Sequence, residues 1–287
     1  MIDPSQQQLP IGVFDSGVGG LTVLHALQAA LPGESFVYLG DTARLPYGTK
    51  SAATIEKYAL RASAHLVGIG IKALVVACNT ASSVALLALR REFADMPVFG
   101  VVEPGAAAAC ARSRNGRIAV IATASTVRGG AYQRAILARR GDARVFARPC
   151  PLLVALAEEG WCTGQVPTLV VEEYLRPWLQ ADGGLQADEG LQGDEAPDTL
   201  LLGCTHYPLL APVIAQVVGE RMALVDSAAT TASDVARTLA DAQLLDPVGQ
   251  QGGLRLFATD DAERFARVGT AFMGEQMRAA DVEVVDL

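Results

Sequence analysis

The sequence predicts an α/β protein with two similar lobes, each with a mainly parallel sheet flanked by helices, and with a cleft between the lobes. Three observations lead to this fold class. Short apolar runs alternate with longer amphipathic stretches, which is typical of β-α-β units. The short runs are almost continuously apolar, as in parallel strands that are covered on both faces. The pattern of the first half also recurs in the second half of the chain.

The first half contains four expected strands and three expected helices. Pro32 and Gly33 are expected to end the first helix, and Ser51 is the expected N-cap of the second one. In order, the expected elements are a strand in "IGVFDSG" from Ile11, a helix over 21–31, a strand in "SFVYLGD", a helix over 51–68, a strand in "KALVVAC", a helix over 82–93, and a strand followed by a turn in "MPVFGVVEPG".

The second half repeats this scheme. "GRIAVIATAST" resembles "PIGVFDSGVGG", and "DTLLLGCTHYP" resembles "KALVVACNTAS". The interval from Ser16 to Cys78 is 62 residues, and the interval from Thr123 to Cys204 is 81 residues. Residues 179–196 account for nearly all of the excess. The repeat therefore favours two lobes of similar design.

Residues 179–196 consist of three copies of a six-residue unit, "LQADGG LQADEG LQGDEA". The unit is acidic, rich in glycine and too short for a solenoid repeat. We interpret it as a solvated surface insertion, with a partner-binding element as the alternative. We expect one lobe to comprise residues 1–103 and 228–287, and the other lobe to comprise residues 104–227.

Composition narrows the class of protein. The chain has 287 residues, of which 51% are hydrophobic and 19% charged, and this supports a substantial core. A net charge of −8 argues against a nucleic-acid partner. Five widely spaced cysteines fit reduced thiols, and neither a membrane span nor a signal peptide is apparent. We therefore expect a cytoplasmic protein with no membrane partner.

Polar residues follow the expected strands at their carboxyl ends. Asp15 and Ser16 follow one strand, Cys78 another, and Thr123 and Cys204 the corresponding strands of the second half. In open α/β sheets, ligands bind outside the carboxyl ends of the strands. If the two lobes face each other, these residues converge on one cleft.

Each cysteine alone is more typical of a buried core residue than of a reactive thiol. Two cysteines at equivalent strand ends, with His206 two residues from Cys204, instead favour a shared catalytic role. A metal site formed by Cys78, Cys204, His206 and Asp15 is the alternative. It is disfavoured because zinc sites usually contain close ligand pairs, and only Cys204 and His206 form one.

Two further motifs suggest substrate contacts. "FDSGVGGLTVL" lacks the lysine of a phosphate-binding loop and the third glycine of a dinucleotide fingerprint. Its glycines form either a tight turn or a carboxylate site at a helix start. "GDTARLPYGTK" is either an ordinary loop or a substrate clamp around Tyr47 and Gly48.

With these motifs together, the sequence closely resembles the glutamate racemase family of the cofactor-independent aspartate/glutamate racemase superfamily. The motifs that carry the resemblance are "IGVFDSGVGGLTV", "YLGDTARLPYG", "ACNTAS", "GVVEPG", "TVRGGAY", "LLGCTHYPLL" and "VDSA", which span Ile11 to Ala228 in order. The resemblance implies interconversion of L- and D-glutamate between two α/β lobes. It also implies that D-glutamate supplies peptidoglycan synthesis.

The resemblance also implies roles for individual residues. Cys78 and Cys204 match the two catalytic thiols, Asp15 the carboxylate near the first thiol, and His206 the histidine beside the second. Glu103 matches an acidic residue near the site. The positions that match substrate contacts are Ser16, Tyr47, Gly48, Asn79, Thr80, Thr123, Thr126 and Thr205. Ser125 and Gly129 depart from the family pattern, as do residues 179–196.

These residues support a mechanism with one acid/base group on each face of the substrate. One thiolate removes the Cα proton while the opposite thiol donates one. We expect no cofactor and no resident metal, and no lysine lies in these motifs to bind a pyridoxal-type group. The substrate is a small molecule, and the sequence leaves open whether the protein is a monomer or a homodimer. The alternatives are a racemase of a related acid such as aspartate, and a non-enzymatic metal- or anion-binding module.

Overall fold

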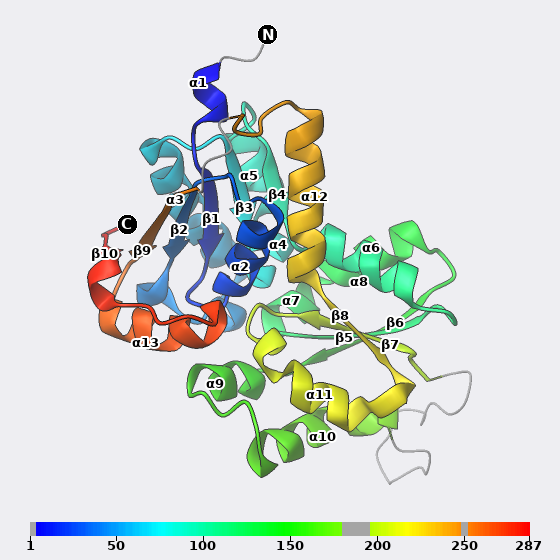
Figure 1. The fold of residues 1–287 in the computed structure, drawn as a ribbon. Coiled ribbons are helices and arrows are strands. Elements are labelled where there is room, and N and C mark those ends of the chain that lie inside the picture. The colour runs from blue at the N-terminus through cyan, green and yellow to red at the C-terminus, as the bar shows by residue number, and fades with distance from the viewer. Residues whose placement is uncertain (1–3, 180–195, 248–251) are drawn as a thin grey trace.

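The computed structural model describes residues 4–179, 196–247 and 252–287. It contains two parallel sheets that lie in separate parts of the molecule (Figure 1). The fold class predicted from the sequence is confirmed. Most of the acidic segment 179–196 lies outside the described residues.

The first sheet has six strands in the order β10-β9-β2-β1-β3-β4, and all of its paired strands are parallel. Its strands are β1 (Ile11–Asp15), β2 (Phe36–Gly40), β3 (Ala73–Val76), β4 (Val98–Gly100), β9 (Leu254–Ala258) and β10 (Val282–Val284). Because helices cover both faces of this sheet, strands β1 to β4 are buried along their whole length.

The helices of the first lobe divide between the two faces of its sheet. One face packs against α2 (Leu21–Ala30), α12 (Ser227–Asp241) and α13 (Ala262–Met273). The other face packs against α3 (Ala52–Ile69), α4 (Asn79–Val84) and α5 (Leu86–Glu92). Shorter elements are α1 (Pro4–Gln7), η1 (Thr42–Arg44), η2 (Tyr47–Thr49) and η6 (Ala279–Asp281). The sheet therefore forms the middle of three layers.

The second sheet has four parallel strands in the order β6-β5-β7-β8. They are β5 (Arg117–Ala122), β6 (Arg144–Pro149), β7 (Thr199–Gly203) and β8 (Ala223–Asp226). One face packs against α6 (Val102–Arg112) and α8 (Ala131–Arg139), and the other against α9 (Leu152–Glu158), α10 (Gln165–Leu179) and α11 (Ala211–Val218). The remaining elements are α7 (Ala124–Gly129), η4 (Tyr207–Leu210) and η5 (Gly219–Arg221).

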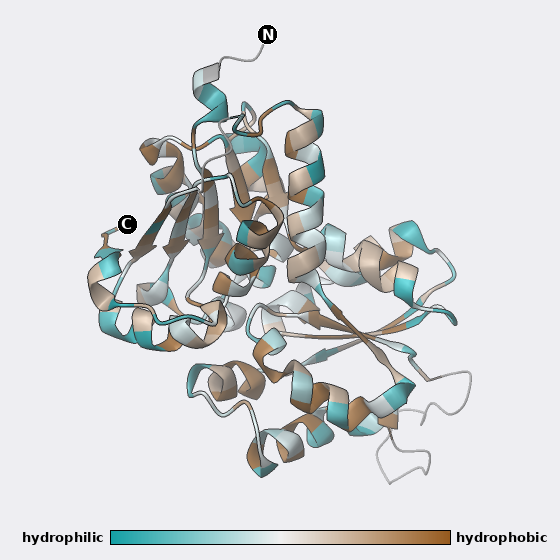
Figure 2. Cartoon of the chain, in the orientation of Figure 1, coloured by the Kyte–Doolittle hydropathy of each residue, from teal (hydrophilic) through white to brown (hydrophobic). Residues whose placement is uncertain are grey.

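Both lobes have an apolar centre. Figure 2 shows predominantly hydrophobic strands inside both lobes, with helices that are hydrophilic on the outside.

The strands of the first sheet come from residues 11–100 and 254–284, and those of the second from 117–226. The chain therefore crosses between the sheets after β4 and again after β8. The lobe boundaries at residues 103 and 227 stay a prediction.

The structure corrects two local expectations. The helix expected over 82–93 begins at Asn79, immediately after Cys78, and is divided into α4 and α5. "VVEPG" is not a turn, since α6 begins at Val102. Pro104 lies in the first turn of α6, where a missing backbone N–H costs no helical hydrogen bond.

The predicted correspondence between the two halves is reflected in the strand pairing. β1 lies beside β3 in the first sheet, and β5 lies beside β7 in the second. Cys78 follows β3 after one residue, and Cys204 follows β7 directly. Each lobe thus presents one thiol at the carboxyl edge of its sheet.

Candidate active site

A cavity of about 490 Å³ lies at this edge and is lined by both lobes. Its volume is within the usual range for small-molecule sites. The lining residues are Ser16, Thr42, Leu45, Pro46, Tyr47, Gly48, Thr49, Cys78, Asn79, Thr80, Thr123, Ala124, Pro151, Val154, Ala155, Glu158, Cys204, His206 and Arg264. The cavity therefore contains the two thiols that the sequence singled out.

Cys78 caps the first turn of α4. Its Sγ accepts a hydrogen bond from the backbone N–H of Ala81 at 3.4 Å and donates one to Ser16 Oγ at 3.3 Å. Burial, together with the charge of Asp15, raises the pKa of Cys78 to about 12. Cys78 is therefore a neutral thiol near pH 7, ready to donate a proton.

Asp15 lies beneath the cavity and is completely buried. Burial raises its pKa, while the charge of His206 and nearby backbone N–H groups oppose that rise. The N–H of Gly17 donates to Oδ2 at 2.9 Å, whereas Oδ1 has no partner among the described residues. The glycine-rich loop after β1 therefore wraps around this carboxylate.

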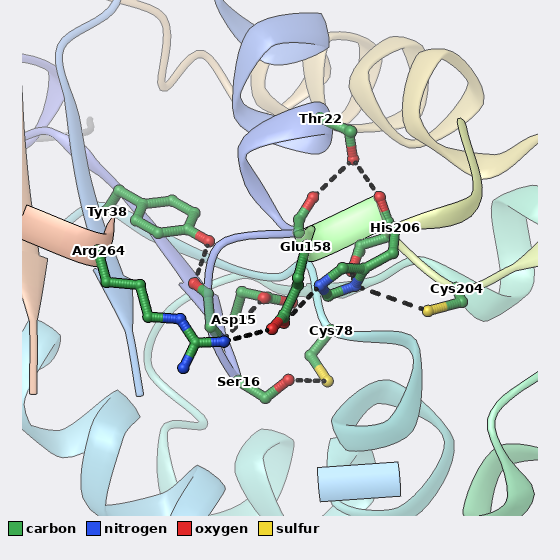
Figure 3. Close-up of polar contacts among 12 residues, drawn as sticks. Asp15, Ser16, Thr22, Tyr38, Cys78, Glu158, Cys204, His206 and Arg264 are labelled. Atoms are coloured by element: carbon green, nitrogen blue, oxygen red, sulfur yellow. Dashed lines mark hydrogen bonds and ion pairs between the residues drawn. The ribbon is translucent and has the colours of Figure 1, made fainter. Parts of the chain in front are cut away.

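Cys204 belongs to a chain of polar contacts that runs through His206 and Glu158 to Arg264 (Figure 3). His206 Nδ1 lies 3.8 Å from Cys204 Sγ, and its Nε2 lies 3.1 Å from Glu158 Oε1. Burial disfavours the imidazolium, but the hydrogen bonds and charges of Cys204 and Glu158 outweigh it and raise the pKa of His206 to about 10. Near pH 7 His206 is therefore protonated and can donate to both neighbours.

Glu158 completes this chain. Burial would raise its pKa, but hydrogen bonds and charges from His206 and Arg264 lower the pKa below its ordinary value. Glu158 lies on α9 of the second lobe, and Arg264 lies on α13 of the first lobe. The two thiols therefore have different surroundings: an aspartate under Cys78, and an imidazolium beside Cys204.

Three hydroxyls also join the two lobes at the cavity. Thr80 Oγ1 lies 2.9 Å from Thr123 Oγ1 and 3.2 Å from Thr126 Oγ1, and the last two are 3.0 Å apart. Thr80 comes from α4, whereas Thr123 caps α7. This cluster can donate to and accept from a polar ligand.

The loop around Tyr47 forms another wall. The Tyr47 hydroxyl donates to Asp41, which also accepts hydrogen bonds from Arg44 and from Thr259. A Cβ at Gly48 would lie 2.7 Å from Thr123 Cβ, so glycine permits the close approach of the two lobes there.

The side-chain oxygen of Asn79 accepts a hydrogen bond from the Tyr132 hydroxyl, and the buried Nδ2 of Asn79 has no partner among the described residues.

The structure brings together most of the predicted site residues. Cys78, Cys204, His206 and six of the predicted contact residues line the cavity: Ser16, Tyr47, Gly48, Asn79, Thr80 and Thr123. Asp15, Thr126 and Thr205 are buried directly behind this lining, where they contact its residues or act on their charge. Glu103 lies elsewhere, on the half-exposed surface of α6, and forms an ion pair with Arg139.

The sequence did not indicate Glu158 and Arg264. Glu158 ends a short helix next to a second glutamate, and Arg264 lies in "DDAERFARV", so both resemble ordinary surface residues. Their contact joins positions 106 residues apart. A charge pattern along the chain carries no signal for such a pair.

Residues 4–179, 196–247 and 252–287 contain no group of three or more His, Cys, Asp or Glu side chains arranged to hold a metal ion. Within the same residues, no helix is both long enough and apolar enough to span a membrane.

Comparisons with known proteins place this site in a wider context. Residues 11–235 match the Asp/Glu/Hydantoin racemase family. Glutamate racemase of Geobacter metallireducens is 48% identical over 96% of both chains, and that of Neisseria gonorrhoeae is 46% identical over 98% of both. The structure resembles Francisella tularensis glutamate racemase in complex with D-glutamate, with a TM-score of 0.86, 33% identity and 98% coverage of both chains. The Thermus thermophilus enzyme in complex with β-chloro-D-alanine gives a TM-score of 0.82 at 42% identity, over 100% of this chain and 99% of that one.

Proposed function

Because the chain belongs to the Asp/Glu/hydantoin racemase family, we propose that it is a glutamate racemase that interconverts L- and D-glutamate. The observation that supports this most strongly is the pair of thiols, one from each lobe, that line one cavity. Racemisation requires a proton to leave one face of Cα and another to arrive on the opposite face. Two acid/base groups on opposite walls can do this without moving the substrate.

The proposed step begins when one thiolate takes the Cα proton. The Cα–H bond breaks, an S–H bond forms, and the electron pair passes into the α-carboxylate as a planar enolate. The opposite thiol then gives its proton to the other face of Cα and becomes a thiolate. The two hydrogens exchange between carbon and sulfur, so neither an oxidant nor a reductant is needed.

The surroundings of the thiols suit these two states. Cys78 is neutral near pH 7 because of its raised pKa, and it is therefore the proton donor in one direction. On the other side, imidazolium His206 lies beside Cys204 and can return a proton to it in the reverse direction. On the side of Cys78, the charge of Asp15 raises the pKa of the thiol. We therefore assign Asp15 the task of assisting proton transfer at Cys78, as His206 does at Cys204.

The hydroxyls and amide of the cavity are assigned to the substrate. Ser16, Asn79, Thr80, Thr123, Thr126 and Thr205, with the loop at Tyr47 and Gly48, supply donors for two carboxylates and acceptors for an ammonium group. The unpartnered Nδ2 of Asn79 fits a carboxylate oxygen. We propose that D-glutamate formed here supplies peptidoglycan synthesis, and that the protein works in the cytoplasm, where its free thiols stay reduced.

The decisive experiment follows the optical rotation of L-glutamate with no cofactor added, with L-aspartate as a parallel substrate. We expect L-glutamate to lose its rotation fully and its product to carry deuterium at Cα when the solvent is D₂O. Cys78→Ser and Cys204→Ser should each abolish racemisation. Cys110→Ser is the matched control, because its thiol contacts the Ile136 carbonyl outside the cavity, and it should retain activity. Turnover of aspartate alone, or full activity of either active-site variant, would contradict the proposal.

A further inference from the structure

Arg264 occupies a fixed position at the start of α13. Asp261 caps this helix, and its Oδ1 accepts a hydrogen bond from the Arg264 backbone N–H at 2.9 Å. From there the side chain extends to the other lobe, where Nη2 donates to Glu158 Oε2 at 3.0 Å (Figure 3). Arg264 and Glu158 therefore form an ion pair between the lobes at the rim of the cavity.

The two oxygens of Glu158 have different partners. Oε2 accepts from Arg264, and Oε1 lies 3.1 Å from His206 Nε2. The Glu158 side chain is only 14% exposed, whereas that of Arg264 is 50% exposed. A carboxylate held at one oxygen by a guanidinium presents its second oxygen in a fixed direction. That direction leads to the imidazole that contacts Cys204.

We propose that Arg264 is a positioning residue: it holds Glu158 against His206. It thereby keeps His206 in place to exchange a proton with Cys204. This inference rests on the racemase function proposed above. Because the two ends of the ion pair lie on different lobes, Arg264 places Glu158 only when the lobes are together. The chain of contacts from Arg264 through Glu158 and His206 to Cys204 is complete in the arrangement of the lobes seen in this structure.

Other charged groups around this chain determine what a change at Arg264 does. His206 faces Cys204 on its own loop, Glu158 on α9 and the charge of Asp15 on β1, and the ring of Phe272 on α13 covers it edge-on. Arg264 also lines, together with Glu158, Asp260 and Asp261, a smaller neighbouring hollow of about 90 Å³. The described carboxylate that lies between Arg264 and His206 is Glu158.

Loss of Arg264 has two opposite electrostatic effects on His206. Removal of a positive charge by itself would favour the imidazolium. Release of Glu158 from its place would disfavour the imidazolium, since the contact with that carboxylate raises the pKa of His206. The second effect acts at 3.1 Å, whereas the first acts from beyond Glu158, so a positioning role predicts that release dominates.

The test compares Arg264→Gln with Arg267→Gln. Arg267 is an exposed arginine on the same helix that does not line the cavity, so the control removes the same charge. The chain has three histidines, and their ring signals can be followed by NMR against pH. In Arg264→Gln we expect the His206 titration to move to lower pH by about one unit or more. We also expect kcat to fall about tenfold with little change in KM. Arg267→Gln should change neither quantity.

Two further variants sharpen the result. Arg264→Lys keeps a positive donor and should restore most of the His206 titration and of kcat. In a Glu158→Gln background, Arg264→Gln should have almost no further effect, because the two residues act in series. If Arg264→Gln alone is poorly folded, Arg264→Met, which also removes the charge and keeps the apolar stem, replaces it in both backgrounds.

Several outcomes would overturn the proposal. An unchanged or upward-shifted His206 titration would reduce Arg264 to a surface charge. A rise in KM with constant kcat would make it a substrate contact instead. If the effects of Arg264→Gln and Glu158→Gln on kcat were fully additive, Arg264 would not act through Glu158. Wild-type protein that does not racemise glutamate would instead refute the proposed function, and the NMR titration would still report on the contact.

Discussion

At the scale of single residues, the two thiols are equivalent in strand position but not in surroundings. Cys78 lies above a buried aspartate and donates to a serine, while Cys204 lies beside a protonated histidine. In the proposed mechanism, each turnover exchanges the protonation states of the two thiols. The protein therefore has to accommodate a thiol and a thiolate at both positions, by different means.

His206 makes the stability of the protein depend on pH. Its pKa in the folded protein, about 10, lies above the ordinary value of 6.5. Its contribution to the free energy of unfolding is therefore complete below pH 6.5 and is lost as pH rises towards 10. We expect urea unfolding of the wild type to show a loss of a few kcal/mol over this interval.

His206→Asn should be flatter than the wild type between these pH values, and the difference between their two curves isolates the histidine. His25→Asn is the matched control, because His25 is exposed on α2. It should follow the wild-type curve. Parallel curves for the wild type and His206→Asn would mean that folding does not raise the pKa of His206.

The sequence was sufficient to predict that Cys78, Cys204 and His206 meet at one cavity with Asp15 beside them, because the pattern of a polar residue after an apolar strand occurs twice. It was not sufficient to predict Glu158 and Arg264. In the sequence, each stands at a polar position of a helix, where glutamate and arginine are ordinary. Their importance arises only when α9 and α13 meet across the cavity.

At the scale of elements, helix starts carry much of the site. Cys78 and Thr123 are N-caps, and each accepts a hydrogen bond from a backbone N–H of the helix that it precedes. The sequence predicted Ser51 as a cap correctly, and Thr54 N–H does donate to its Oγ. It missed the cap at Cys78 because cysteine is an unusual capping residue. The expected start of the following helix was therefore three residues late.

Cys78→Ser should separate catalysis from folding. A serine hydroxyl is a better acceptor for the Ala81 N–H than a thiol, so α4 keeps its cap. We expect a free energy of unfolding within about 1 kcal/mol of the wild type, together with complete loss of racemisation. Urea unfolding and polarimetry on the same sample measure both. A free energy of unfolding several kcal/mol below that of the wild type would show that the thiol is needed for the fold.

At the scale of the whole molecule, glycines allow the lobes to approach closely. A Cβ at Gly19 would lie 2.5 Å from both His206 Nδ1 and Thr205 Oγ1. Close to this contact, the Thr22 hydroxyl donates to the Thr205 carbonyl at 3.3 Å. The loop after β1 and the loop after β7 are thus pressed together, and a single methyl group would force them apart.

Gly19→Ala should therefore displace His206 and reduce kcat by at least tenfold, since small misplacements of acid/base groups are costly. Gly68→Ala is the control, because a Cβ there meets no atom within 4 Å and Gly68 lies in helix α3. We expect it to stabilise the protein by about 0.5–1 kcal/mol with unchanged kcat. Wild-type activity of Gly19→Ala would show that the loops can separate without loss of function.

Because the first sheet takes strands from both ends of the chain, it cannot be completed until translation is almost finished. Strands β1 to β4 emerge first, but their sheet also requires β9 and β10, which are made after the whole second sheet. β2 must therefore wait for its neighbour β9 while residues 117–226 are translated. The later lobe can thus complete its sheet before the earlier one. Until then, the edge of β2 in the nascent chain stays unpaired and is open to chaperones.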